Sequence, residues 1–117
     1  MKLQVSFDIT DLEQAVSIAR TIEEHIDIFE VGTLLLYQYG VQSIDRFVKE
    51  FPNKIIFADT KLVDRAREAV DMMAKAQTHW ISIMAGAHKD TLQAGCTTAH
   101  NNNIKDMLDL LDSKAPG

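Results

Sequence analysis

The stretch KIIFADTKLVD, residues 54–64, is the part of the sequence that most constrains the fold. Its short apolar run, bounded upstream by Pro52, is typical of a buried strand. Asp59 would then lie at the C-terminal end of this strand, with Lys61 and Asp64 in the loop beyond it. This is the end of the strands where α/β folds place their chemistry.

Taken alone, the pattern D-x-K-x-x-D has little specificity. Charged residues are common in loops, and Asp64 could simply cap the helix that follows. The significance of the pattern therefore depends on what the ends of the other strands carry.

Composition places the chain in an ordinary class. Its 117 residues, 46% hydrophobic and 25% charged, predict one globular domain, 1–117. The net charge of -5 and the lack of a basic stripe argue against nucleic acid as a partner. Cys96 is the single cysteine, and its small neighbours indicate a structural role in a packed helix. We expect a cytoplasmic protein with no membrane partner, because there is no signal-peptide pattern and no apolar run approaching roughly 20 residues.

Strand-like and helix-like segments alternate along the chain. The expected strands are 2–9, 26–32, the apolar part of 54–64, and 80–84, and the expected helices are 12–22, 41–51, 65–76 and 92–99. Thr10 with Glu13 predicts a capping box for the first helix, and Asp90 predicts the cap of the last one. The run 101–103, three asparagines, predicts a turn.

The segment 104–111 fits two structures. Its apolar residues match one face of a helix, but its central part could equally be a short buried strand that bears the acid Asp109. With this strand, acids would mark four strand ends: Asp8, Glu30, Asp59 and Asp109. The alternation predicts a parallel sheet, either doubly wound or part of a (β/α)8 barrel. The sequence has no G-x-G-x-x-G or P-loop motif, so a nucleotide-binding doubly wound sheet has no support.

Four stretches carry a family resemblance: QVSFD at 4–8, FEVGT at 29–33, ADTKLVD at 58–64 and AGAHKDTL at 85–92. Together, and in this order, they resemble the N-terminal half of the 3-hexulose-6-phosphate synthase family. That family belongs to the orotidine 5'-phosphate decarboxylase superfamily, and 3-keto-L-gulonate-6-phosphate decarboxylase is its nearest relative. The stretch 85–92 favours the synthase, and the decarboxylase stays the alternative.

The resemblance implies a fold and a reaction. The fold would be the N-terminal half of a (β/α)8 TIM barrel, with four to five parallel strands and the site at their C-terminal ends. The reaction would be the aldol condensation of ribulose 5-phosphate with formaldehyde, or the cleavage of hexulose 6-phosphate, through an enediolate stabilised by Mg²⁺. A non-catalytic half barrel or a partner-binding module is a further alternative.

The resemblance also implies roles for five residues. Glu30 and Asp59 would be the Mg²⁺ ligands, Asp8 would contact a substrate hydroxyl, and Lys61 would be the cation beside the developing oxyanion. Asp64 would reach into the site of the neighbouring subunit, which implies a homodimer. Hard oxygen ligands of this kind suit Mg²⁺.

The chain also departs from the family pattern. A complete barrel takes roughly 200 residues or more, and the usual phosphate site follows its seventh and eighth strands. Leu34 replaces a usual proline, 65–67 replaces a small glycine-containing stretch, and Gln77 stands at a glycine position where φ is expected to be left-handed. Because an open parallel sheet leaves unpaired edges, we also expect self-association, with two chains completing one core.

Overall fold

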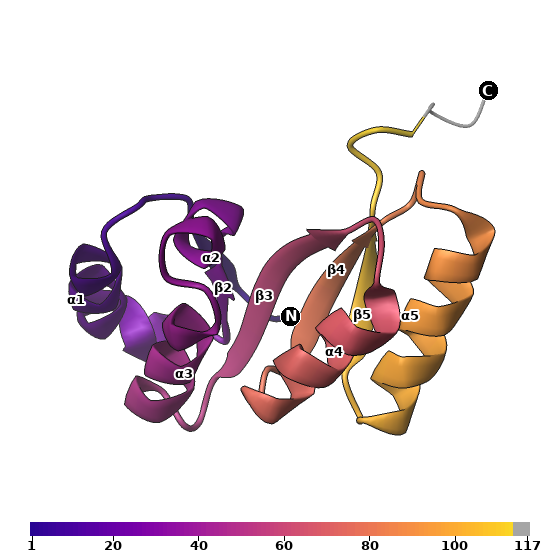
Figure 1. The fold of residues 1–117 in the computed structure, drawn as a ribbon. Helices are drawn as coiled ribbons and strands as arrows, with labels where there is room; N and C mark the ends of the chain where they lie inside the picture. Colours follow the sequence, from indigo (N-terminus) through magenta and orange to yellow (C-terminus); the bar gives the residue numbers. More distant parts are fainter. Residues whose placement is uncertain (114–117) are drawn as a thin grey trace.

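The computed structural model describes residues 1–113 and shows strands alternating with helices (Figure 1). The strands are β1 (Gln4–Phe7), β2 (Ile28–Val31), β3 (Ile55–Leu62), β4 (Trp80–Met84) and β5 (Lys105–Asp109). The helices are α1 (Leu12–Ile22), the 3-10 helix η1 (Glu23–His25), α2 (Thr33–Tyr39), α3 (Val41–Glu50), α4 (Ala66–Lys75) and α5 (Lys89–Asn101). Within this described part of the chain, no helix is long and apolar enough to cross a membrane.

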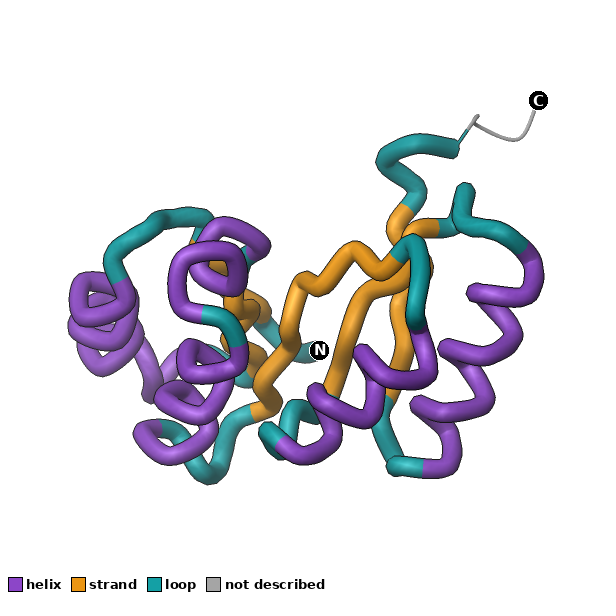
Figure 2. Tube along the Cα trace, in the orientation of Figure 1, coloured by secondary structure: helices purple, strands orange, loops and turns teal. Residues whose placement is uncertain are grey.

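The five strands form one parallel sheet in the order β1-β2-β3-β4-β5. Each strand pairs with the next one along the chain, and the helices supply the crossovers that parallel neighbours require. Figure 2 shows α3, α4 and α5 on one side of the sheet, which we call the helix-covered face. The opposite side is called the open face. Because all strands run the same way, their last residues gather along one end of the sheet.

Four phenylalanines form the centre of the core on the helix-covered face. Phe29 of β2 is fully buried, and its ring centroid lies 5.7 Å from Phe7, 6.0 Å from Phe47 and 4.8 Å from Phe51. Tilted ring pairs at such distances contribute about 0.5–1.5 kcal/mol each beyond the area that they bury. Successive side chains of a strand point to opposite faces, so Glu30, next to Phe29, lies on the open face.

Helices α4 and α5 cover the second half of the sheet. The fully buried side chains between these helices and the sheet include Ile81 and Ile83 of β4 and Val70 of α4. Gly95 of α5 lies against β4, where an added Cβ would be 2.7 Å from Ile83 Cδ1. The lack of a side chain at Gly95 therefore allows α5 to pack close to the sheet.

Cys96 has the structural role that the sequence predicted. On α5, its Sγ donates a hydrogen bond of 2.8 Å to Oδ2 of Asp106 in β5. This bond, together with burial, raises the pKa of the Cys96 thiol to about 11. The thiol therefore stays protonated at neutral pH and links α5 to β5 through this hydrogen bond.

The ambiguous segment 104–111 contains β5, so the strand alternative is correct. Its pairing with β4 places Met84 beside Asp109. A strand is favoured because the neighbouring edge of β4 is open to pair with it, which the local pattern alone cannot show. The short helix α2 was not predicted. Gly40, with φ of 62°, separates it from α3.

The predicted end of the third strand was wrong. β3 runs on to Leu62, so Asp59 and Lys61 lie inside the strand and not at its end and in the loop beyond. The register between β3 and β4 shifts between Ala58 and Leu62. Such a bulge leaves residues of one strand unpaired and bends it, and it can redirect side chains near a site.

Both predicted helix caps were also wrong by one or two positions. Asp11, and not Thr10, caps α1, because its Oδ1 accepts a hydrogen bond of 3.1 Å from the backbone N of Gln14. His88 caps α5, and its Nδ1 accepts from the backbone N of Asp90 at 3.2 Å. Helix α1 still begins at Leu12, as expected, whereas α5 begins at Lys89, three residues before its expected start.

Two turn predictions were correct. Gln77, after α4, has φ of 65°, the left-handed conformation expected at its family glycine position. Of the predicted turn over 101–103, Asn102 and Asn103 form a turn and Asn103 has φ of 56°, but Asn101 is the last residue of α5. Left-handed φ costs a non-glycine residue about 1–2 kcal/mol, so Gln77 is held in place by its surroundings.

Candidate functional site

The strand ends on the open face surround a small hollow of about 200 Å³. Its polar lining comes from all five strands, and the lining residues are Gln4, Glu30, Phe57, Asp59, Ser82, Met107, Leu108 and Asp109. Sequence reasoning placed Glu30 and Asp59 at one site, and the structure does bring them to the same hollow. Parallel pairing is the cause, because it aligns the carboxyl ends of neighbouring strands.

Glu30 is held by residues of β1. Gln4 Nε2 donates a hydrogen bond of 3.0 Å to Glu30 Oε1, and Ser6 Oγ makes a short hydrogen bond to Glu30 Oε2. Ser6 Oγ also lies 3.1 Å from Asp8 Oδ2. Ser6 thus links Asp8 to Glu30, although the Asp8 side chain itself is exposed just beyond the end of β1.

Burial raises the pKa of the Glu30 carboxyl above its ordinary value of 4.5. The negative charges of Asp59 and Asp8 raise it further, whereas the hydrogen bond from Ser6 and the charge of Lys61 lower it. An acid surrounded by other acids in a half-buried position is costly to ionise without a cation. The site therefore carries an excess of negative charge on the β1 and β2 side.

Lys61 supplies the positive charge on the other side of the site. Its Nζ lies 2.6 Å from Asp109 Oδ2 and 3.3 Å from Asp59 Oδ2. The hydrogen bond to Asp109 is the largest cause that raises the pKa of the Lys61 ammonium, and the same bond lowers the pKa of Asp109. Lys61 is therefore a fixed cation between two carboxylates.

Lys61 also has an unusual backbone. Its φ of 46° is left-handed, which is rare for a residue with a side chain. Such outliers persist only where the surrounding contacts hold them, and they cluster at functional sites. Here, the Lys61 backbone N donates a hydrogen bond of 2.9 Å to Ser82 Oγ.

Asp64 is not brought to the hollow. It is exposed in the loop after β3, and its Oδ1 accepts from the backbone N of Arg65 at 2.8 Å. It does not cap α4 in the usual way, since the N-cap position of that helix is Arg65, in a left-handed conformation. Asp64 therefore lies outside the group formed by the other predicted site residues.

Two site residues were missed by the sequence reasoning. Asp109 was noted only as the mark of a possible strand end, but the structure pairs it with Lys61. Ser82 Oγ donates a hydrogen bond of 2.6 Å to Asp59 Oδ1. Assigning 105–109 as a strand would have pointed to Asp109 at its end. A serine inside an apolar strand such as β4 is a weaker sequence signal.

The residues at the hollow fit a Mg²⁺ ion. Glu30 and Asp59 both line it, and Asp59 is close enough to influence the charge of Glu30. Mg²⁺ commonly takes one or two protein carboxylates and keeps several waters. Residues 1–113 contain no group of three or more His, Cys, Asp or Glu side chains that could hold an ion. The other ligand positions would therefore belong to water or to substrate oxygens.

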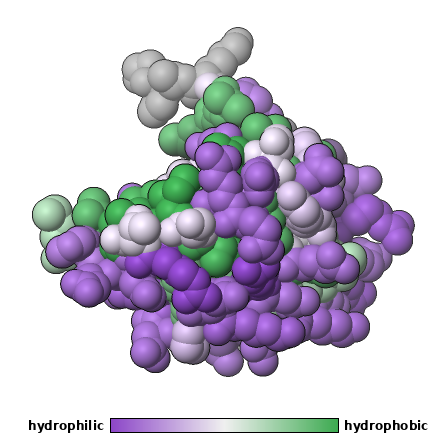
Figure 3. Space-filling model, turned by 90° about the vertical axis from the view of Figure 1, so that its left-hand side faces the viewer, coloured by the Kyte–Doolittle hydropathy of each residue, from purple (hydrophilic) through white to green (hydrophobic). Residues whose placement is uncertain are grey.

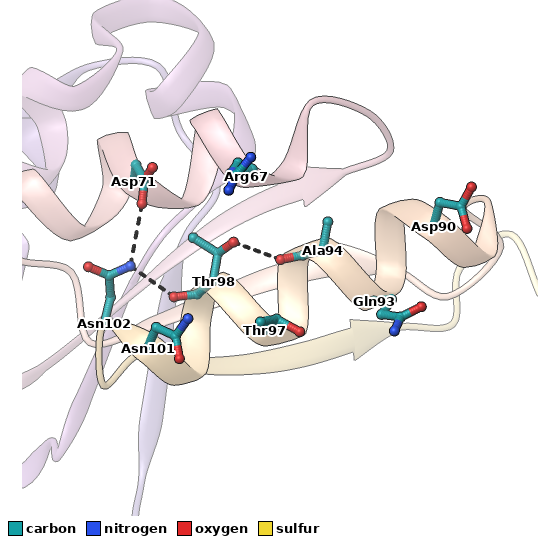
Figure 4. Close-up of a pocket in the computed structure, with 9 residues that line it drawn as sticks. All are labelled: Arg67, Asp71, Asp90, Gln93, Ala94, Thr97, Thr98, Asn101 and Asn102. Atoms are coloured by element: carbon teal, nitrogen blue, oxygen red, sulfur yellow. Dashed lines mark hydrogen bonds between the residues drawn. The ribbon is translucent and has the colours of Figure 1, made fainter.

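A different hollow, of about 500 Å³, lies between α4 and α5 (Figure 4). Its polar groups bond to one another: Asn102 Nδ2 donates to Thr98 O at 2.8 Å and to Asp71 Oδ1 at 3.4 Å. Thr98 Oγ1 in turn donates to Ala94 O at 2.8 Å. This hollow lies on the helices and shares no lining residue with the strand-end site.

The fold and the strand-end acids define the class of protein. Five parallel strands with alternating helices, and charged residues at their carboxyl ends, form half of a (β/α)8 barrel. A crystal structure of a 3-hexulose-6-phosphate synthase covers 94% of this chain and 53% of its own, with a TM-score of 0.90 and 33% identity. A 3-keto-L-gulonate-6-phosphate decarboxylase from Vibrio cholerae covers 92% of this chain and 50% of its own, with a TM-score of 0.89 and 29% identity.

Sequence comparison gives the family. Residues 1–116 match the orotidine 5'-phosphate decarboxylase / HUMPS family. The chain belongs to this family, as its sequence motifs predicted. It is 32% identical over 111 residues to the 3-hexulose-6-phosphate synthase of Mycobacterium gastri, covering 95% of this chain and 54% of the relative. The chain thus spans about half the length of the curated relatives that it matches.

Proposed function

We propose that this chain takes part in hexulose-6-phosphate synthase chemistry, joining ribulose 5-phosphate to formaldehyde or reversing that reaction. The observation that carries the proposal is the arrangement at the hollow, where Lys61 lies between Asp59 and Asp109 with Glu30 nearby. Membership of the family and 32% identity to a synthase support it. The relatives are about twice as long, so the activity of this chain is the point to be tested.

The charged residues suit a reaction that builds negative charge on a sugar oxygen. Lys61 is kept protonated by its two carboxylate partners and would lie beside the oxygen that gains charge. A fixed cation in a partly dry cleft stabilises such charge more than water does. Asp8, exposed just beyond the end of β1, would accept a hydrogen bond from a substrate hydroxyl in this proposal.

Glu30 and Asp59 would hold Mg²⁺ in this proposal. When bound, the ion would act as a Lewis acid on the carbonyl and hydroxyl oxygens of the ketose. Glu30 is the side chain with most to gain from a cation, because burial and neighbouring acids disfavour its ionised form. Asp59 would contribute while it keeps its contacts to Lys61 and Ser82.

We further propose that two copies associate, and that Asp64 of each copy acts in the site of the other. Large apolar side chains are exposed on and after the edge strand β5: Met107, Leu108, Leu110 and Leu111. Leu3, just before the opposite edge strand β1, is also exposed. In Figure 3, hydrophobic surface gathers at the upper left of the view, and hydrophilic surface covers the lower part. A second copy would remove this apolar surface from water.

Sedimentation of the purified chain tests the association. We expect a dimer or larger species at micromolar concentration, and Leu108→Lys should weaken it. Tyr37→Lys is the matched control, because Tyr37 is 83% exposed on α2 and belongs to neither edge strand. A compact monomer at micromolar concentration would contradict the proposal.

An assay of formaldehyde consumption with ribulose 5-phosphate and MgCl₂ tests the reaction. Lys61→Ala should lower the rate by about 100-fold or more, as is usual when a stabilising charge is removed. Lys105→Ala is the control, because Lys105 Nζ lies 5.6 Å above the Trp80 ring and not beside the carboxylates. If the unmutated chain shows no Mg²⁺-dependent turnover, it is a non-catalytic half barrel or a partner-binding module.

The decarboxylase reaction is the second candidate. It is supported by the 29% identity and TM-score of 0.89 to the decarboxylase from Vibrio cholerae. Release of CO₂ from 3-keto-L-gulonate 6-phosphate, without consumption of formaldehyde, would replace the first proposal by this one.

A further inference from the structure

The pairing of β3 with β4 is interrupted at the candidate site. Ala58 pairs with Ile81 and Leu62 pairs with Ile83, so Asp59, Thr60 and Lys61 all stand opposite the single residue between Ile81 and Ile83. That residue is Ser82. The main chain of the bulged segment cannot complete a regular ladder with one residue opposite, so its polar groups need other partners.

Ser82 bonds to one main-chain group of the bulge, the Lys61 N, and to the side chains of Asp59 and Thr60. Its Oγ accepts the hydrogen bond from the Lys61 backbone N at 2.9 Å, and its backbone O accepts from Thr60 Oγ1 at 2.7 Å. Its hydroxyl proton is then free to be donated to Asp59 Oδ1, at 2.6 Å. One buried residue, 2% exposed, thus contacts every member of the bulge.

The contact with Asp59 sets the direction of that carboxylate. Oδ1 is held by Ser82, and Oδ2 faces Lys61 Nζ at 3.3 Å. The same hydroxyl fixes the Lys61 backbone, whose φ of 46° is unfavourable for a lysine. Ser82 therefore controls both charged groups at once, through two bonds of one oxygen atom.

We propose that Ser82 is a positioning residue, whose hydroxyl holds the Asp59 carboxylate towards the metal position and the Lys61 side chain towards the substrate. The inference rests on the proposed function for its consequence in turnover. Its structural part, the joint orientation of Asp59 and Lys61, does not depend on which sugar phosphate is bound. Outer partners of metal ligands typically change metal affinity or activity by about 10–100-fold when removed.

Neighbouring hydroxyls have a lesser role. Thr33 Oγ1 donates to the backbone O of Asp59 at 2.8 Å, and Thr60 Oγ1 donates to the backbone O of Ser82. Both fix main-chain groups and leave the carboxylate and ammonium untouched. Only Ser82, among these three, bonds to the Asp59 side chain.

The test compares three variants with the unmutated chain. Ser82→Ala removes the hydroxyl, and Ser82→Thr keeps it. Ser43→Ala is the matched control, because Ser43 is another fully buried serine whose hydroxyl bonds only to Gly40 O, at 2.7 Å, in the turn before α3. Three quantities are measured: hydrogen exchange of the Lys61 amide, Mg²⁺ binding by titration calorimetry, and turnover with ribulose 5-phosphate and formaldehyde.

Ser82→Ala should speed exchange of the Lys61 amide by about 10-fold or more and weaken Mg²⁺ binding by about 10–100-fold. Turnover should fall mainly through kcat, because the substrate itself is not contacted. Ser82→Thr should restore all three values, and Ser43→Ala should leave them unchanged. If the unmutated chain has no turnover, the proposed reaction fails, while the amide exchange and Mg²⁺ titration still decide the role of Ser82.

Two results would overturn the inference. One is a Ser82→Ala protein whose Lys61 amide exchange rate and Mg²⁺ affinity equal those of the unmutated chain. The other is a Ser43→Ala protein that shows the same losses, since this would reveal general loosening of the fold. If Ser82→Ala does not fold, Ser82→Cys is measured in its place, because a thiol has a similar shape and is a weaker donor and acceptor. Its amide exchange and Mg²⁺ affinity should lie between those expected for Ser82→Ala and those of the unmutated chain. Values equal to those of the unmutated chain would also overturn the inference.

Discussion

The two faces of the sheet are built on opposite principles. On the helix-covered face, Phe29, Ile81 and Ile83 are fully buried among apolar neighbours. On the open face, Glu30 and Asp59 from adjoining strands are half-buried acids, and the pKa of Glu30 is raised first by burial and then by the charge of Asp59. The first face gives the chain its stability, and the second keeps like charges together at a cost in stability. Proteins accept such a cost where charges are needed for function.

The largest effect is expected from an attack on the helix-covered face. Phe29→Ala removes the ring that contacts three other phenylalanines, and it should lower the free energy of unfolding by about 3–5 kcal/mol. Urea unfolding followed by circular dichroism measures the change. Tyr37→Ala is the control, and its effect should stay within about 0.5 kcal/mol because the side chain is exposed. A similar loss in both variants would show that the aromatic cluster is not the centre of stability.

The next effect should separate stability from site geometry. A Cβ at Gly32 would lie 2.3 Å from Phe7 O and 2.8 Å from Asp8 Oδ1, so Gly32→Ala should cost about 1–3 kcal/mol and displace Asp8. Gly40→Ala should cost a similar amount, about 1–3 kcal/mol, because φ is 62° there, but an added Cβ would meet no atom within 4 Å.

Unfolding curves and the carboxyl carbon resonance of Asp8 check this pair of variants. The resonance should move in Gly32→Ala and stay in place in Gly40→Ala. An unmoved resonance in both would mean that the end of β1 is not coupled to the start of α2.

A substitution on the open face should have the opposite sign. The pKa of Glu30 is raised, mainly by burial, so the folded state disfavours its ionised form. Stability from this group is therefore present at acid pH and is lost as the pH rises through the raised pKa. Glu30→Gln avoids this loss and should stabilise the chain at neutral pH, with the advantage vanishing below the ordinary value of 4.5.

Urea unfolding at several pH values, in the presence of a chelator, measures the effect of Glu30→Gln. At each pH, the urea midpoint of Glu30→Gln is compared with that of the unmutated chain. The increase in midpoint should be larger at pH 7 than at pH 4. A lower midpoint at pH 7 would show that Glu30 is favourably paired when ionised.

The smallest effect on stability concerns Cys96, a polar group on the helix-covered face. Its thiol pKa is raised from 9.0 to about 11, first by the bond to Asp106 and then by burial. The stabilisation is therefore fully present below pH 9.0 and is lost as the pH rises through about 11. Asp106→Asn should lower this pKa and speed iodoacetamide alkylation at pH 9 by about 10-fold. Equal rates in the two proteins would contradict the role of Asp106.

Several features of the fold were readable from the sequence because their signals are local. The alternation of apolar residues predicted the strands, and the expected strand ends gave Asp8, Glu30 and Asp59, although β3 continues past Asp59 to Leu62. Helix caps were less accurate, because Asp11 and its neighbour Thr10 can both cap a helix and only the helix start decides between them. The family motifs raised the strand-end pattern from a weak signal to a specific one.

The sequence by itself determined the alternating strands and helices, the parallel sheet, and the acids that line one end of it. Only the tertiary structure decided that 105–109 is a strand, that Lys61 pairs with Asp109, 48 residues away, and that Ser82 stands opposite a bulge. The reason is physical: periodicity and capping are set by residues close in sequence, whereas bulges and ion pairs form between strands. The charged residues of the stretch 54–64 were evident from the sequence, but contacts with the neighbouring strands determined where their side chains lie.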